Sequence, residues 1–73
     1  MNQKGAAQRR YYEEINRKVD PQKYLILGAA IRRTKAKYQD DGVVYLINGY
    51  FHPGRKSKHV ALMSKVAWPK RDD

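Results

Sequence analysis

The dipeptide Asp20-Pro21 is the clearest break in this sequence, and it divides the chain into a short N-terminal segment and a longer remainder. Aspartate is a favoured N-cap, and proline is favoured in the first helical turn, where its missing N–H costs nothing. The dipeptide therefore predicts that one helix ends before it and that a second helix begins at it.

Before the break, residues 6–18 are rich in good helix formers, and Glu14 precedes Lys18 by the four residues that suit an ion pair on one helical face. We expect a helix over 6–18 behind a disordered tip at 1–5. Its apolar stripe is thin, and an isolated helix of about 12–15 residues is marginal in water. This helix is therefore expected to fray, and to order fully only on a partner.

After the break, residues 21–38 favour a second helix. A strand remains the competing interpretation, because alternate residues from Leu25 to Ile31 are also apolar and Gly28 weakens a helix by about 1 kcal/mol. A turn over 39–42 follows, with Gly42 free to adopt positive φ. In the helical interpretation the apolar residues share one face: Tyr24, Leu27, Ile31, Thr34 and Tyr38.

The rest of the chain predicts two strands. Residues 43–52 favour a strand in which Gly49 is a gap or bulge, and Pro53-Gly54 ends it. Apolar residues alternate again over 60–68, where Leu62 is expected to face the core. The loop between the strands makes them an antiparallel hairpin.

A chain of 73 residues forms one domain at most, and it has no cysteine to cross-link a small core. A lone hairpin is barely stable in water, so this one must pack on another element. We therefore predict a small α+β domain over 6–69, with a hairpin or small sheet packed on the second helix and a tail at 70–73.

Charge is distributed unevenly along the chain. The net charge is +9, and from Gly42 to Arg71 there are six basic residues and no acidic one. Such a surface attracts polyanions or acidic partners. Arginine beside tyrosine can also pair with carboxylate or phosphate and stack on a flat group. The basic and aromatic clusters give the predicted contact residues: Arg9, Arg10, Tyr11, Arg32, Arg33, Arg55, Lys56 and Lys58.

The sequence contains few residues of the kinds that enzymes use for catalysis. No thiolate metal site is possible without cysteine, and Ser57, one of only two serines, has no acid near it in sequence. We therefore predict a binding protein that is no enzyme and uses no cofactor or metal. The longest apolar run, Tyr24–Ile31, is eight residues, far short of the roughly 20 that span a bilayer, so no membrane partner is expected.

The chain, and especially its opening MNQKGAAQRRYYEEINRKVDPQKYLILGAAIRR, resembles the small transcription regulators of lytic Xanthomonas phages. This resemblance implies a protein of the host bacterial cytoplasm that binds RNA polymerase as a monomer, at the N-terminal region of the β′ subunit near the β flap and the RNA exit channel. It implies weaker attachment of the σ factor, inhibited initiation and read-through of intrinsic terminators, with nascent RNA close by. It supplies no contact residues, so those above come from the charge pattern.

The alternative is an autonomous small DNA- or RNA-binding protein, which rests on charge alone. Its affinity would fall steeply with salt, by about 10³–10⁵ between 50 and 200 mM for 6–10 phosphate contacts. Binding to purified polymerase separates the two functions.

Overall fold

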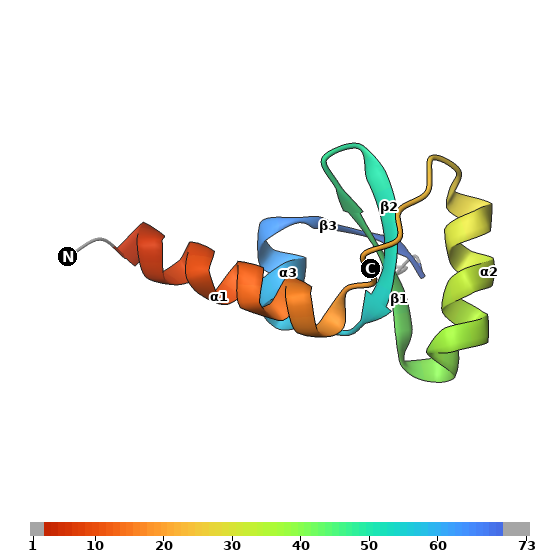
Figure 1. Ribbon diagram of the computed structural model, residues 1–73, viewed down its shortest axis with the longest axis horizontal. Helices are drawn as coiled ribbons and strands as arrows, with labels where there is room; N and C mark the ends of the chain where they lie inside the picture. Colours follow the sequence, from red (N-terminus) through yellow and green to blue (C-terminus); the bar gives the residue numbers. More distant parts are fainter. Residues whose placement is uncertain (1–2, 70–73) are drawn as a thin grey trace.

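A three-stranded antiparallel sheet in the order β2-β1-β3 forms the centre of the molecule. The computed structural model describes the backbone of residues 3–69 and the side chains of residues 8–69. Helices α1 and α3 lie on one side of the sheet and α2 on the other (Figure 1). This arrangement confirms the predicted small α+β fold. In chain order the elements are α1 (Gln3–Lys18), α2 (Leu27–Lys37), the 3₁₀ turn η1 (Gln39–Asp41), β1 (Gly42–Ile47), β2 (Tyr50–Arg55), α3 (Lys58–Met63) and β3 (Lys65–Trp68).

The hairpin of the sheet turns at Asn48 and Gly49, which both have positive φ (53° and 82°). Asn-Gly with two positive φ angles is typical of a two-residue hairpin turn, and Ile47 accordingly pairs with Tyr50 across it. The predicted continuous strand over 43–52, with Gly49 as a bulge, is therefore wrong. The chain reverses within it and forms both β1 and the first half of β2.

Pro53 and Gly54, predicted to end a strand, lie inside β2. Proline is tolerated there because β2 is an edge strand of the sheet. Gly54 permits close contact with α1, since a Cβ atom at this position would lie 2.6 Å from the carbonyl oxygen of the last residue of α1. Isolated bridges join Val19 to Gly54 and Tyr24 to Phe51, so the segment after α1 covers the edge of β2.

The predicted second strand over 60–68 is wrong in its first half, which is helical. Ser57 caps α3, because its Oγ accepts a hydrogen bond from the N–H of Val60 at 3.3 Å. The good helix formers of 61–63 follow this cap, and only the residues from Lys65 onward extend into β3. β3 pairs antiparallel with β1, so the predicted pairing of the two segments is confirmed in part, but β2 and α3 lie between these strands and no hairpin joins them.

Leu62, predicted to face the core, is 82% exposed on α3, whereas Val60 is fully buried. We expect Leu62→Ala to change the free energy of unfolding by less than about 0.5 kcal/mol, as surface substitutions usually do. The matched variant Val60→Ala should cost about 1.5–3 kcal/mol, because it truncates a buried side chain. Chemical denaturation measures both changes, and equal losses in the two variants would contradict this arrangement of α3.

Helix α2 confirms the helical interpretation of the segment after Asp20, but it begins only at Leu27. Asp20 is not its N-cap. That position falls to Ile26, whose side chain makes no capping hydrogen bond. The intervening residues run beside β2 instead, because Tyr24 exchanges two backbone hydrogen bonds with Phe51, at 2.9 and 2.8 Å. Pairing with the sheet edge therefore outweighs the local helix-start signal.

The connection from α2 to β1 also differs from the prediction. Gln39, and not Gly42, adopts positive φ (57°), while Gly42 has an extended φ of −81°. Glycine is needed at position 42 for a different reason: a Cβ atom there would collide with the side chain of Thr34 and lie 2.9 Å from Cβ of Tyr38. Gly42 therefore lets the C-terminal part of α2 pack directly on β1.

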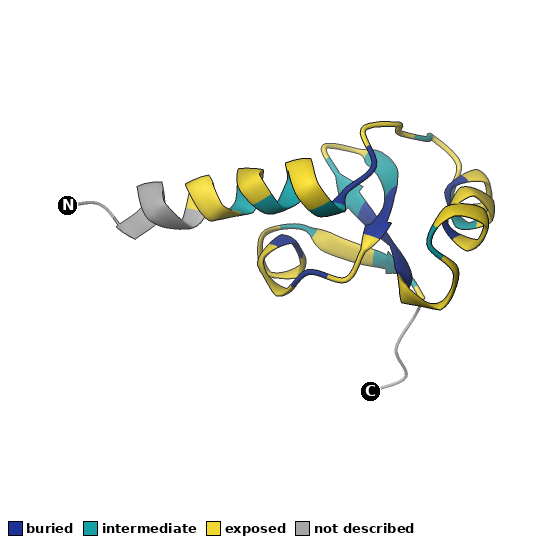
Figure 2. Cartoon of the chain, turned by 60° about the horizontal axis from the view of Figure 1, so that its bottom comes forward, coloured by how far each residue is buried: buried dark blue, intermediate teal, exposed yellow. Residues whose placement is uncertain are grey.

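Buried residues lie on both faces of the sheet, where the elements meet (Figure 2). Val44 of β1 is fully buried on the face that α2 covers, and α2 contributes its own buried Ala30 and Thr34. The opposite face carries the main apolar cluster, formed by Val19, Val43, Tyr45 and Val60 with Tyr11, Ile15 and Ile47 packed around it.

Helix α1 confirms the helix predicted over 6–18 and begins earlier, at Gln3. Its first turns project away from the body of the molecule (Figure 1). Met1 and Asn2 of the predicted tip, and the predicted tail at 70–73, lie outside the described residues. Among the described helices, none is long and apolar enough to cross a membrane.

Candidate partner-binding surface

Three of the predicted contact residues are exposed at the short connection from β2 to α3: Arg55 ends β2, Lys56 follows it, and Lys58 begins α3. This connection is anchored by Tyr45, whose side chain is 1% exposed. The Tyr45 hydroxyl donates to the carbonyl oxygen of Arg55 at 2.7 Å and accepts from the N–H of Ser57 at 2.8 Å. Two hydrogen bonds from one buried hydroxyl therefore fix the backbone that carries the basic side chains.

Burial raises the pKa of the Tyr45 hydroxyl, and the negative charge of Glu14 adds to this rise, while the hydrogen bond from Ser57 opposes it. The hydroxyl is therefore neutral at physiological pH and serves as both donor and acceptor. It supplies the acceptor that the buried N–H of Ser57 needs and a donor for the part-buried carbonyl of Arg55.

We expect Tyr45→Phe to cost about 1–3 kcal/mol in the free energy of unfolding, because the N–H of Ser57 is left buried without its acceptor. Chemical denaturation measures this loss. Hydrogen exchange of the amide of Ser57 should also become faster than that of other core amides, since the connection loses its anchor. Tyr50→Phe is the matched control, and it should change stability by less than about 0.5 kcal/mol.

Ser57 joins the same connection to α1. Its Oγ donates to Oε2 of Glu14 at 3.2 Å, and Glu14 also pairs with Lys18 at 3.3 Å, as predicted for residues four apart. Burial acts to raise the pKa of Glu14, but the hydrogen bonds from Lys18 and Ser57 and the nearby positive charges outweigh it, so the pKa lies below its ordinary value. Glu14 is thus an ionised acceptor that places Lys18 beside the basic connection.

On its other side the connection meets the end of α2. The guanidinium carbon of Arg55 lies 5.5 Å from the centroid of the Tyr38 ring, and Nζ of Lys37 lies 5.4 Å from the same ring. Both distances are within the reach of a cation–π contact. These contacts link cations of α1 and α2 to the connection, and we call this set the basic band: Lys18, Lys37, Arg55, Lys56 and Lys58.

Asp20 is a buried acid that pairs with Lys37 of the basic band. Its carboxylate is 4% exposed, accepts from the N–H of Gln22 at 3.0 Å, and pairs with Lys37 at 3.2 Å and Arg33 at 3.6 Å. Burial acts to raise its pKa, but the Gln22 hydrogen bond and the two cations outweigh burial and lower it. Arg33, predicted as a contact residue, therefore has an intramolecular partner, although its side chain remains 43% exposed.

No protein-family model, curated protein or solved structure matches this chain. Among residues 3–69, no group of three or more His, Asp or Glu side chains could hold a metal ion.

The remaining predicted contact residues do not join the basic band. Arg32 is exposed on α2 and, unlike its neighbour Arg33, makes no ion pair among the described residues. Arg9 and Arg10 are exposed on α1, before the first described side chain of that helix that packs on the core, Tyr11. They present a second, separate basic patch on the projecting helix.

Tyr11 itself is half-buried against the apolar cluster. Burial raises its pKa, as does neighbouring Tyr12, while a hydrogen bond with Ser64 lowers it. Tyr12, whose ring centroid is 5.3 Å from that of Tyr11, is 60% exposed. Tyr12 is therefore the better placed of the two for contact with a partner.

Sequence reasoning missed an exposed apolar pair. Leu25 and Ile26 are 75% and 71% exposed, in a shallow groove that Ala29 and Tyr50 also line. Nζ of Lys23 lies 4.2 Å from the centroid of the Tyr50 ring at the same groove. A signal was present, because neither Leu25 nor Ile26 falls on the apolar face of the predicted helix. Large exposed aliphatic side chains beside a cation are typical of a protein-contact surface.

Proposed function

We propose that this protein is a transcription regulator that binds bacterial RNA polymerase through the basic band. The observation that carries the proposal is the fixed presentation of Arg55, Lys56 and Lys58 by the buried hydroxyl of Tyr45 and by the Ser57–Glu14 hydrogen bond. Ordering a flexible loop on binding costs free energy, so a connection whose backbone is already fixed avoids that part of the cost.

Charge favours an acidic partner over self-association. The chain carries a net charge of +9, and two copies would repel one another. An acidic surface on a large enzyme would attract the same chain and increase its association rate. This supports the expectation of a monomer that acts on a larger partner.

The choice of polymerase rests on the resemblance to small phage transcription regulators. On that basis the partner site is the N-terminal region of β′, beside the β flap and the RNA exit channel. A protein of this size bound there would compete with attachment of σ and so inhibit initiation. Its cations, placed near emerging RNA, would also bind the phosphates of the single strand, and this binding would compete with closure of a terminator hairpin and promote read-through.

The projecting end of α1 is a second contact in this proposal. Arg9 and Arg10 are exposed outside the packed part of the helix. We expect Arg9→Ala with Arg10→Ala to weaken polymerase binding about three- to tenfold, as loss of rim charges typically does, with little change in melting temperature. Surface plasmon resonance and a thermal melt measure the two effects, and a melting temperature that falls by several degrees would identify these arginines as structural instead.

The proposal is tested with purified core polymerase, σ factor and a template that carries a promoter and an intrinsic terminator. The protein should bind core enzyme in a pull-down at about 150 mM salt, reduce run-off product when added before σ, and increase read-through when added to stalled elongation complexes. Failure to bind core enzyme would overturn the proposal.

An autonomous nucleic-acid-binding function is the second candidate. It is favoured by cations outside the basic band, such as Lys35 and Lys65, that make no ion pair among the described residues. Affinity for free duplex DNA or RNA that falls by 10³ or more between about 50 and 200 mM salt, without binding to polymerase, is the result expected of this function.

A further inference from the structure

A pocket lies where α2 and η1 lead into β1, beside the end of β3, and it adjoins the basic band through Gly42, the strand partner of Arg55. It is lined by Lys35, Gln39, Asp40, Gly42, Trp68 and Pro69 and has a volume of about 520 Å³. Pockets of roughly 300–1,000 Å³ are the size that hold small molecules or single nucleotides. None of the side-chain contacts described for the basic band involves these residues.

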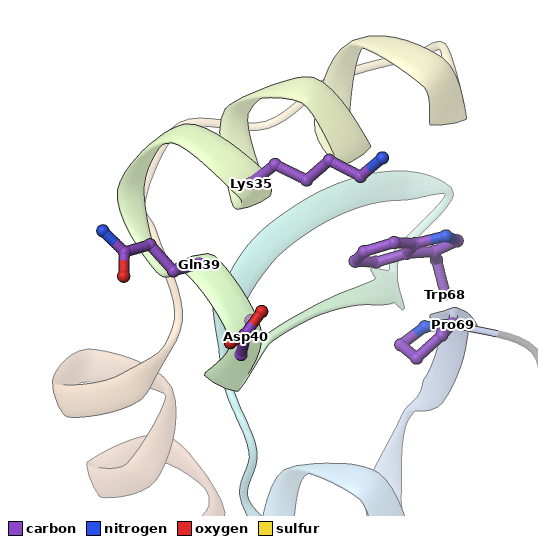
Figure 3. Close-up of a pocket in the computed structure, with 6 residues that line it drawn as sticks. Lys35, Gln39, Asp40, Trp68 and Pro69 are labelled. Carbon is purple, nitrogen blue, oxygen red and sulfur yellow. The ribbon is translucent and has the colours of Figure 1, made fainter.

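Trp68 is the aromatic wall of this pocket and the chain's single tryptophan. It is half-buried, and β3 holds it in position opposite Val44 of β1. Nζ of Lys35 lies 5.9 Å from the centroid of the indole ring, and Figure 3 shows the lysine side chain extending toward it. A flat, rigid ring with an adjacent cation is the arrangement that proteins use to stack a base and hold the phosphate next to it.

The wall of the pocket opposite Trp68 carries a negative charge, the carboxylate of Asp40. Asp40 is exposed in η1, and in Figure 3 it lies across the pocket from Trp68 and Pro69. The side chain of Gln39 points away from them in the same view. One carboxylate, one ammonium group and one indole ring therefore surround the pocket from different sides. Such a set accepts a ligand that has a flat face, a negative charge and hydrogen-bond donors on its far edge.

We propose that this pocket binds an unpaired guanine nucleotide of a single-stranded nucleic acid. The base stacks on Trp68, Lys35 pairs with the adjacent phosphate, and Asp40 accepts hydrogen bonds from the base. A carboxylate has two oxygen acceptors side by side, and guanine alone offers two adjacent donors, N1–H and N2–H, on its Watson–Crick edge. Adenine and cytosine place a ring-nitrogen acceptor there, and uracil offers one N–H between two carbonyl oxygens.

The proposal goes beyond polymerase binding and does not depend on it, because the pocket belongs to the isolated chain. Its test uses the fluorescence of the single tryptophan. The full-length protein is titrated with GMP, AMP, CMP and UMP at constant ionic strength, with ribose 5-phosphate as the ligand without a base. N-acetyltryptophanamide corrects for quenching by collision, and dGMP beside GMP reports whether the sugar distinguishes RNA from DNA.

We expect saturable quenching by GMP with an affinity at least fivefold higher than for the other three nucleotides, and none by ribose 5-phosphate. Asp40→Asn should remove most of the preference for GMP and leave AMP binding unchanged. Asp41→Asn is the matched control, because Asp41 is an exposed neighbour that does not line the pocket. Lys35→Ala should weaken all four nucleotides by a similar factor, about three- to tenfold.

Two results would overturn the proposal. One is linear quenching by every nucleotide, which is the behaviour of collision in solution. The other is a preference for GMP that survives Asp40→Asn, since the base would then be read elsewhere. Neither result bears on the pull-down with polymerase, so the two proposals succeed or fail separately.

Discussion

Charge reversal of the basic band, as Lys56→Glu with Lys58→Glu, is expected to weaken binding to core RNA polymerase about 30- to 100-fold, or ~2–3 kcal/mol. Both lysines are exposed beside a backbone that Tyr45 fixes, so each reversed charge would meet the acidic partner surface directly. The fold should tolerate the change, because a glutamate at the start of α3 favours the helix N-terminus.

The matched control is Arg32→Glu with Lys65→Glu, which changes the net charge by the same amount at exposed positions outside the band. Biolayer interferometry on immobilised core polymerase, at two salt concentrations, measures both pairs. The band variant should lose more affinity and show the weaker salt dependence. Equal losses in the two double variants would mean that total charge, and no particular surface, determines binding.

Local signals correctly predicted the helices of the first half. The ion pair between Glu14 and Lys18 and the helix over 6–18 follow from short-range spacing, which needs no knowledge of the rest of the fold. The helix after Asp20 was predicted correctly as a helix, but its first residue was placed too early. The residues between Asp20 and the helix pair with the edge strand β2 instead, and sequence spacing does not reveal a pairing partner that lies about 30 residues away.

The strands were harder to place, for two different reasons. The Asn48-Gly49 turn was visible in the sequence as a strong hairpin signal, and the prediction overlooked it in favour of Pro53-Gly54. The position of Pro53 inside β2, by contrast, depends on β2 being an edge strand, which is a property of the complete sheet. Alternating apolar residues over 60–63 were then assigned to a strand although Ser57 offered a helix cap.

The candidate site also contains some residues that the sequence reveals and others that only the fold brings together. The cluster of Arg55, Lys56 and Lys58 is visible in the sequence because its members are neighbours. Lys18 and Lys37 join them only through tertiary contacts that their local partners make: Glu14, which pairs with Lys18, contacts Ser57, and Tyr38, next to Lys37, contacts Arg55. Arg33 illustrates the converse: it belongs to a basic cluster in sequence, yet Asp20, 13 positions earlier, is its ion-pair partner.

Asp20→Asn is expected to lower the free energy of unfolding by about 2–3 kcal/mol, because a buried carboxylate loses two charged partners and keeps only the hydrogen bond from Gln22. The loss stays at the lower end for a buried ion pair, since Lys37 and Arg33 are 42% and 43% exposed and water can solvate them. In a domain of this size it corresponds to a melting temperature roughly 10–20 °C lower.

The carboxylate of Asp20 should also make the free energy of unfolding depend on pH in the acid range. Because the pKa of Asp20 is lower in the folded protein than its ordinary value of about 3.9, the stabilisation is complete above that value. It is lost as the pH falls through the lowered folded pKa. The difference in stability between the parent and Asp20→Asn should therefore be constant from about pH 5 to 7 and shrink below about pH 4.

Denaturation with urea at pH 7, 5, 4 and 3 measures this dependence, with Asp41→Asn as the control that removes an exposed carboxylate. The control should follow the parent within about 0.5 kcal/mol at every pH. A gap between parent and Asp20→Asn that persists undiminished at the lowest pH would show that Asp20 acts through shape rather than charge. A shrinking gap would show that an ionised Asp20 holds Lys37 beside Tyr38, and so joins α2 to the basic band.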